Sequence, residues 1–224
     1  MKIAFYAPLK SPDHPVPSGD RLMARQLVQA LRAGGHDVEI ASHLRSFHAT
    51  PETFLPNLEA EANSEIDRLA TIWETEGPPD LWFCYHPYYK APDLIGPALT
   101  RRFSLPFVTA EASYSNRRNI GCWARAQDDL KVQLEGAALN FCFTARDEAG
   151  LAAAVPEARL ARIAPFIDAT PFTELDAARE DGRLVTVAMM RAGDKMQSYT
   201  ALAEALHLVC SEKWRLAIVG DGPE

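Results

Sequence analysis

Short apolar runs alternate along the chain with longer segments of helical periodicity. Ile3–Ala7 has no internal polar residue, as expected of a parallel strand covered on both faces. Apolar residues then recur with helical spacing between Ser18, which suits an N-cap, and Gly34–Gly35, which suits a helix end. A second strand is predicted at Asp37–Ser42.

The same alternation continues to residue 163. We predict helices over residues 57–76, 91–102 and 123–138, a short helix before Pro156, and strands at Leu81–Tyr85, Leu105–Ala110, Asn140–Thr144 and Leu160–Ile163. This strict β-α order predicts an α/β fold with a doubly wound, parallel, Rossmann-like sheet. Ligands of such sheets bind beyond the carboxyl ends of the strands, so we expect function in the loops after Ala7, Tyr85, Ala110 and Thr144.

The alternation lapses between Ala164 and Gly182, where prolines and the charged stretch Glu174–Gly182 indicate a crossing segment. A new strand at Leu184–Met189, a helix through Leu208 and a strand at Leu216–Val219 begin a second βαβ unit. We therefore predict an N-terminal domain over 1–164, a crossing segment over 165–182 and an incomplete second Rossmann-like domain over 183–224. Two strands and one helix cannot cover both faces of a sheet, so this part is a fragment or needs cover from elsewhere.

Composition places the chain among globular proteins, with 47% hydrophobic and 24% charged residues. The net charge of −7 argues against nucleic-acid binding, but it leaves room for a local basic pocket for a nucleotide diphosphate. The four cysteines form no C-x-x-C pair and are interpreted as buried free thiols in a reducing compartment. With neither a signal-peptide pattern nor a run of about 20 apolar residues, we expect a cytoplasmic protein.

Polar residues with possible chemistry follow three of the predicted strands. Gly19 opens a helix, where it suits a phosphate or sugar approaching the backbone, or else a plain turn and cap. The absence of a G-x-G-x-x-G or P-loop pattern disfavours a nicotinamide-dependent reductase and a P-loop hydrolase. His86 and the tyrosines beside it suit sugar recognition or ordinary rim packing, and Glu111 follows the next strand. No metal site is predicted.

Arg191 and Lys195 lie between the predicted strand and helix of the second unit. Two cations beside a helix N-terminus suit a diphosphate, although a solvated loop has the same composition. The pair Arg117–Arg118 suits a phosphate or else is a solvated turn, and this pair or Arg101–Arg102 suits an anionic membrane surface.

The ordered set of these motifs resembles the retaining glycosyltransferases of family 4, which have the GT-B architecture of two Rossmann-like domains facing a cleft. The passages that carry the resemblance are Ser18–Asp20, Leu27–Val38, Pro79–His86, Leu105–Thr109, Ile163–Phe172 and Val219–Glu224. The family's Gly-Arg pair before the lysine is Met189–Met190 here, with Arg191 one place later. The region that carries the family's E-x7-E motif lies beyond Glu224.

The resemblance implies transfer of a sugar, with retention, from a nucleotide-diphosphate sugar to a saccharide or lipid-linked acceptor, without a cofactor. It implies that Gly19 approaches the donor, that His86 contacts a sugar hydroxyl, and that Lys195 neutralises the leaving diphosphate. Glu111 and Arg191 are expected to bind substrate or donor. Peripheral contact with the inner face of a membrane is a further expectation. This chain alone is expected to be inactive, and the alternative is a non-catalytic binding or regulatory protein derived from such an enzyme.

Overall fold

A computed structural model describes the chain except for residues 54, 174–180 and 211–212. The chain forms two compact units, Met1–Asp168 (unit 1) and Ala169–Glu224 (unit 2). The predicted crossing segment contains residues 174–180, so most of its charged stretch lies outside the described residues.

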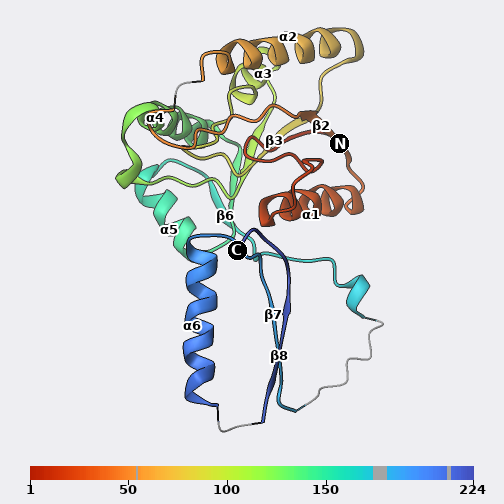
Figure 1. Ribbon diagram of the computed structural model, residues 1–224. Helices are drawn as coiled ribbons and strands as arrows, with labels where there is room; N and C mark the ends of the chain where they lie inside the picture. Colours follow the sequence, from red (N-terminus) through yellow and green to blue (C-terminus); the bar gives the residue numbers. More distant parts are fainter. Residues whose placement is uncertain (54, 174–180, 211–212) are drawn as a thin grey trace. The chain divides into compact units, whose positions relative to one another are not determined.

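Unit 1 is built on a six-stranded sheet (Figure 1). Its strands are β1 (Lys2–Tyr6), β2 (Asp37–Ser42), β3 (Leu81–Tyr85), β4 (Phe107–Ala110), β5 (Leu139–Cys142) and β6 (Leu160–Arg162). Its helices are α1 (Gly19–Ala33), α2 (Leu58–Glu76), α3 (Gly96–Phe103), the short η1 (Asn116–Arg118), α4 (Gly121–Gly136) and α5 (Ala145–Ala154). All neighbouring strands are parallel, which confirms the predicted α/β fold.

The alternation of side chains along β1 explains why the sheet is covered on both faces. Ile3 and Phe5 point into a core shared with α1, whereas Ala4 and Tyr6 join a core shared with α2 and α3. All four side chains are buried. An uninterrupted apolar strand thus supplies both layers of a doubly wound domain.

The strand order is β2-β1-β3-β4-β5-β6. From β1 the chain moves to one edge of the sheet and then returns to build β3 and the later strands on the other side. The topological switch point therefore lies between β1 and β3, which pair directly from Ile3 with Leu81 to Tyr6 with Cys84. The crevice beyond the carboxyl ends of these two strands is where sheets of this kind hold ligands.

The helix predicted over 91–102 begins later, at Gly96. The Asp93 carboxylate accepts hydrogen bonds from the backbone N–H groups of Ile95 and Gly96, at 3.0 and 2.8 Å. It also accepts one from the indole Nε1 of Trp82 at 2.8 Å. These bonds hold residues 93–95 in a buried turn outside the helix, and apolar periodicity alone does not reveal such a turn.

Unit 2 contains the 3-10 turn η2 (Thr170–Phe172), the strand β7 (Arg183–Val187), the helix α6 (Asp194–Leu208) and the strand β8 (Arg215–Val219). β7 and β8 are parallel and pair from Arg183 with Arg215 to Val187 with Val219. This is the predicted βαβ arrangement, and α6 contains no buried residue.

Candidate functional site

The loop after β1 leads into α1, whose first residue is Gly19. The Ser18 hydroxyl caps the helix by accepting a hydrogen bond from the Arg21 N–H at 3.2 Å. A Cβ at Gly19 would meet no atom within 4 Å, so the space beside its backbone is open. Gly19 thus lies at an exposed helix N-terminus at the switch point, where an anionic or polyol group has room to approach.

His86 follows β3 and lies across the switch point from α1. Its Nδ1 is 3.2 Å from Oδ1 of Asp20, the second residue of α1. Because an ionised carboxylate only accepts hydrogen bonds, Nδ1 is the donor, and Nε2 carries no proton in the neutral ring. The hydrogen bond from His86 lowers the pKa of Asp20 below its usual value of 3.8, against a smaller opposing effect of burial. In the neutral ring Nε2 is therefore a hydrogen-bond acceptor, and the described residues offer it no hydrogen-bond partner, so a ligand hydroxyl can bind there.

The backbone at His86 has φ of 57°, and that at Glu111, after the neighbouring strand β4, also has φ of 57°. Such left-handed conformations cost residues other than glycine roughly 1–2 kcal/mol and cluster at functional sites. The His86 N–H donates to the Ala110 carbonyl at 2.8 Å, and the Glu111 N–H donates to the Phe141 carbonyl at 2.9 Å. Each hydrogen bond continues the ladder for one residue beyond its strand, and the left-handed backbone of that residue then turns the chain at the edge of the sheet.

Glu111 is held by Tyr85 rather than by His86. The Tyr85 hydroxyl donates a hydrogen bond to Oε2 of Glu111 at 2.7 Å. Burial, followed by the nearby Glu111 charge, raises the pKa of Tyr85 well above its usual value, so the hydroxyl stays protonated. The Tyr85 ring lies 5.8 Å from the His86 ring, so Tyr85 is near both predicted site residues.

A row of rings, which we call the aromatic row, extends from His86 through Tyr88 and Tyr89 to Trp123. His86 stacks on Tyr88 with ring centroids 4.8 Å apart, and Tyr88 meets Tyr89 edge to face at 5.2 Å. Tyr89 in turn meets Trp123 of α4 at 4.9 Å. The rings of His86, Tyr88 and Tyr89 are partly exposed and suit contact with a sugar or another ring, whereas Trp123 is buried. The row joins the loop after β3 to the helix after β4.

In unit 2, Arg191 lies in the loop after β7, and Lys195 is the second residue of α6. Both side chains are exposed, and the described residues offer neither of them an ion-pair partner. Gly193, with φ of 87°, supplies the left-handed turn that starts the helix. Two free cations beside a helix N-terminus are suited to a diphosphate, and the roles predicted for both residues stay predictions.

The glycines of the Val219–Glu224 passage have a packing reason. The loop after β8 runs beside the loop after β7, where the Met190 N–H donates to the Asp221 carbonyl at 2.8 Å. A Cβ at Gly220 or Gly222 would collide with the Ala188 or Met190 carbonyl oxygen. The passage therefore brings the loops after β7 and β8 into backbone contact next to Arg191.

The two arginine pairs differ in their surroundings. Arg102 forms a surface ion pair with Glu74 at 2.6 Å, so its charge already has a partner. Arg118 instead lies over the Trp123 ring, with its guanidinium carbon 5.9 Å from the ring centroid. In the described part of the chain, no cluster of His, Cys, Asp or Glu suits a metal ion, and no helix is long and apolar enough to span a membrane.

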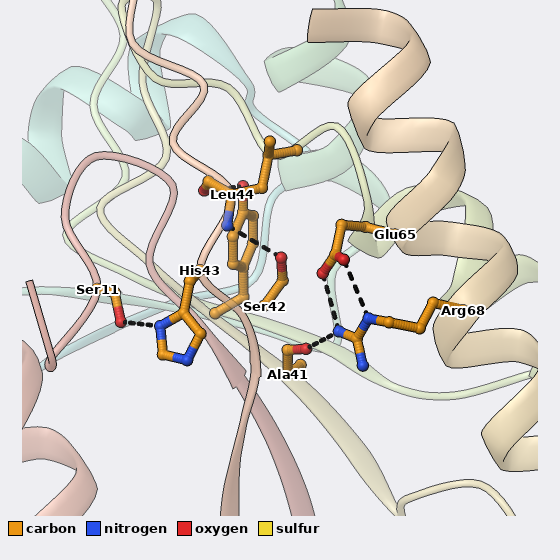
Figure 2. A network of polar contacts seen from close by, with 8 residues as sticks. Ser11, Ala41, Ser42, His43, Leu44, Glu65 and Arg68 are labelled. Atoms are coloured by element: carbon orange, nitrogen blue, oxygen red, sulfur yellow. Dashed lines mark hydrogen bonds and ion pairs between the residues drawn. The ribbon is translucent and has the colours of Figure 1, made fainter.

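A second polar network lies away from the switch point, at the edge strand β2 (Figure 2). Arg68 of α2 bonds to Glu65 and donates to the Ala41 carbonyl at 2.7 Å, and His43 pairs with the Ser11 hydroxyl at 2.9 Å. A cavity of about 830 Å³ lies between β2 and α2 beside this network. The contacts fasten α2 and the loop after β1 to the edge strand, and we assign the network a structural role.

No protein-family model matches the chain, and no curated protein sequence is similar to it. Among solved structures, S. aureus MnaA in complex with UDP is similar, with a TM-score of 0.53 and 17% sequence identity. The match covers 100% of this chain and 62% of MnaA, so the chain spans about three fifths of that protein's length. This similarity confirms the Rossmann-like α/β fold.

The structure has Gly19, His86 and Glu111 after the carboxyl ends of β1, β3 and β4, as predicted, whereas Asp20 had no predicted role and Tyr85 was predicted only as one of the tyrosines beside His86. Both of these residues hold a predicted site residue through a side-chain hydrogen bond. Asp20 adjoins Gly19 in the first helical turn, where an acid is also favoured by the helix dipole. Asp20 lies near His86 because β1 and β3 are neighbours in the sheet, and the spacing of apolar residues along the chain does not predict that strand order.

Proposed function

We propose that the chain is the acceptor-side domain and the start of the donor-side domain of a retaining glycosyltransferase. This enzyme would move a sugar from a nucleotide-diphosphate sugar to an acceptor hydroxyl. The observation that carries the proposal is the Asp20–His86 pair at the topological switch point, beside the open N-terminus at Gly19. The fold shared with MnaA, whose structure was determined with UDP, supports a nucleotide-sugar substrate.

In unit 1, the proposed task of His86 is to bind a sugar hydroxyl through Nε2. Asp20 keeps the proton on Nδ1, so that Nε2 accepts the hydroxyl's hydrogen bond. The strained backbone at His86 fixes the direction of the ring, and the stacking on Tyr88 keeps it there. A preorganised hydrogen-bond acceptor of this kind stabilises the transition state more than the ground state when the bound hydroxyl becomes more acidic in the transition state.

In unit 2, the proposed task of Arg191 and Lys195 is to bind the donor's diphosphate. The bond between the sugar C1 and the diphosphate oxygen breaks, and the diphosphate leaves with the electron pair. The acceptor oxygen forms the new bond to C1 on the same face and gives its proton to the leaving phosphate. Cations and helix N–H groups stabilise the charge that collects on the diphosphate, so the reaction is proposed without a cofactor.

The sheet of unit 2 supports a further part of the proposal. Val185 and Val187 of β7 and Val219 of β8 are 59%, 76% and 53% exposed, although strand valines of a parallel sheet are normally covered. We propose that additional chain, carrying the family's paired glutamates, covers this sheet and completes the donor site. The 224-residue chain alone is then expected to bind ligands without turning over.

The test compares Lys195→Ala with Lys213→Ala, which removes another exposed lysine of unit 2. Binding of UDP, GDP and ADP and of their sugars is measured by calorimetry. Transfer is assayed in this chain and in any longer product of the same reading frame. Loss of a charge-assisted contact of about 1.5–3 kcal/mol predicts at least a 10-fold loss of nucleotide affinity in Lys195→Ala alone.

Equal nucleotide affinity in both variants would overturn the role of Lys195. A chain that binds no nucleotide, in this or any longer form, would instead favour the non-catalytic binding protein. His86→Ala is expected to reduce transfer while leaving nucleotide affinity within about 2-fold, because His86 belongs to the acceptor-side unit.

A further inference from the structure

A second cavity in unit 1, of about 510 Å³, lies beside the aromatic row and has no role in the proposed chemistry so far. It is formed by the loop after β2 with the first turn of α2 that follows it, by the loop after β3, and by the N-terminal half of α4, which follows β4. All three segments leave the carboxyl ends of the strands, the side on which such sheets hold ligands. The volume falls within the range of about 300–1,000 Å³ that is typical of small-molecule sites.

The wall of this cavity is mostly apolar. It includes Leu55, Pro56, Leu58, Pro92, Leu94 and Ala126. Charged groups lie at its rim, where Arg125 and Glu59 are 3.8 Å apart and about four fifths exposed, and where Asp129 is also exposed. An apolar interior with a polar rim fits a hydrocarbon group whose other end stays in water.

Backbone hydrogen bonds hold the cavity open. The Pro51 carbonyl accepts from the Cys122 N–H at 2.9 Å, and the His48 N–H donates to the Lys90 carbonyl at 2.7 Å. Gly121, with φ of 52°, leaves no room for a Cβ beside the Pro51 carbonyl oxygen. The loop after β2 is therefore fastened to α4 and to the loop after β3, and the cavity between them is preformed.

The cavity is also linked to the site. Trp123, the last ring of the aromatic row, donates from Nε1 to the carbonyl of His48, which lines the cavity, at 3.2 Å. Two cations lie over the Trp123 ring, Lys90 with Nζ at 5.0 Å and Arg118 at 5.9 Å from the centroid. Within the described residues, neither cation has a carboxylate at ion-pair distance, so both can meet an anionic group.

We propose that this cavity binds the hydrocarbon chain of an anionic amphiphile, which is the acceptor substrate. Its anionic group lies at Lys90 and Arg118, and its hydroxyl-bearing end reaches along the aromatic row to His86. The identification of the ligand as the acceptor rests on the proposed function, whereas the binding of the amphiphile does not.

Binding of three probes by calorimetry, each below its critical micelle concentration, tests the proposal. Decyl phosphate has the chain and the charge, ethyl phosphate lacks the long chain, and decyl glucoside lacks the charge. Burial of even four methylene groups predicts that decyl phosphate binds about 100-fold more tightly than ethyl phosphate. Lys90→Ala is expected to weaken decyl phosphate about 5-fold and to leave decyl glucoside unchanged, as for one exposed charge contact.

Two variants locate the chain. Ala126→Phe places a ring in the cavity, and Val132→Phe places the same ring on the exposed side of the same helix, where Val132 is 68% exposed. Decyl phosphate affinity is expected to fall at least 10-fold in Ala126→Phe and to remain unchanged in Val132→Phe. If Ala126→Phe does not fold, Leu94→Glu serves instead, because Leu94 is only partly buried and a carboxylate there repels the probe.

Equal binding of decyl and ethyl phosphate, or equal affinity in Ala126→Phe and Val132→Phe, would overturn the proposal. Nucleotide binding is measured separately with the same samples. A chain that binds decyl phosphate in the cavity but no nucleotide contradicts the proposed function alone. A chain that binds nucleotide but not decyl phosphate contradicts only the amphiphile site.

Discussion

Units 1 and 2 both follow the order strand, helix, parallel strand, but they bury their apolar residues to very different extents. In unit 1, β1 and β3 have buried side chains on both faces of the sheet. In unit 2, most residues of β7 and β8 are exposed, and none of the described residues of this unit is buried. The sequences of the strands are similarly apolar, so the difference lies in what covers them.

This comparison shows that strand periodicity reports what a segment is able to bury, whereas neighbouring elements decide what it does bury. Unit 1 has α1 on one face of its sheet and α2 and α3 on the other. Among its described residues, unit 2 has α6 as its one α-helix, and a cavity of about 430 Å³ remains between that helix and β8. Unit 1 therefore has the cores of an independent domain, and unit 2 does not.

Separating the units gives the largest expected effect. A chain of residues 1–168 is expected to unfold in urea in one cooperative transition, because all three buried clusters lie within it. A chain of residues 169–224 is expected to show no such transition in circular dichroism. Cooperative unfolding of the second chain as a monomer would contradict the comparison.

Substituting a buried leucine of unit 1 and an exposed leucine of unit 2 gives the next largest expected effect on stability. Leu99 of α3 is 0% exposed, and Leu208 of α6 is 83% exposed. Leu99→Ala is expected to lower the free energy of unfolding by about 2–5 kcal/mol, because it removes buried area and leaves a cavity. Leu208→Ala is expected to change it by less than about 0.5 kcal/mol. A comparable loss in both variants would mean that α6 is covered in solution.

Much of the fold was predictable because the limits of most helices and strands of unit 1 follow from residues close together in the sequence. The strands at Asp37–Ser42 and Leu81–Tyr85 have the predicted limits, and α2 starts only one residue later than predicted. The start of α3 was wrong, because a buried carboxylate at Asp93 holds the preceding turn through contacts with Trp82 and two backbone N–H groups. Such a turn depends on a tertiary environment that apolar spacing does not encode.

The candidate site was predictable only as far as the edge of the sheet on which it lies. The carboxyl-end rule correctly placed Gly19, His86 and Glu111 there, but which of them meet depends on strand order and side-chain direction. His86 thus pairs with Asp20 across the β1-β3 junction, while Glu111 turns to Tyr85. The positions of Arg191 and Lys195 relative to these residues involve both units, and their roles stay predictions.

Two glycines of α4 test how firmly the loop after β2 is held in unit 1. Gly121 has a left-handed backbone and lies against the Pro51 carbonyl, whereas a Cβ at Gly136 would meet nothing within 4 Å. Gly121→Ala is expected to destabilise the protein by about 1–3 kcal/mol through backbone strain and this collision. Gly136→Ala is expected to be neutral or stabilising by up to about 1 kcal/mol in urea unfolding. Equal stability of both variants would mean that the loop is not fastened to α4.

Acidic residues in the first turns of α1 and α6 give the smallest effect and compare the two units directly. Asp20 accepts a hydrogen bond from His86, whereas Asp194 has no such side-chain partner among the described residues. Because the hydrogen bond lowers the pKa of Asp20 in the folded state, its contribution to stability is present above the unfolded pKa of about 3.9. That contribution is lost as the pH falls through the folded-state pKa.

The Asp20 side chain is 37% exposed, so the loss of stability in Asp20→Asn at neutral pH is expected to stay below about 1 kcal/mol. Urea unfolding between pH 7 and pH 3 checks this, since the deficit of Asp20→Asn should shrink on acidification and that of Asp194→Asn should be smaller throughout. A deficit of Asp20→Asn that is independent of pH would show that the pairing with His86 does not stabilise the ionised carboxylate.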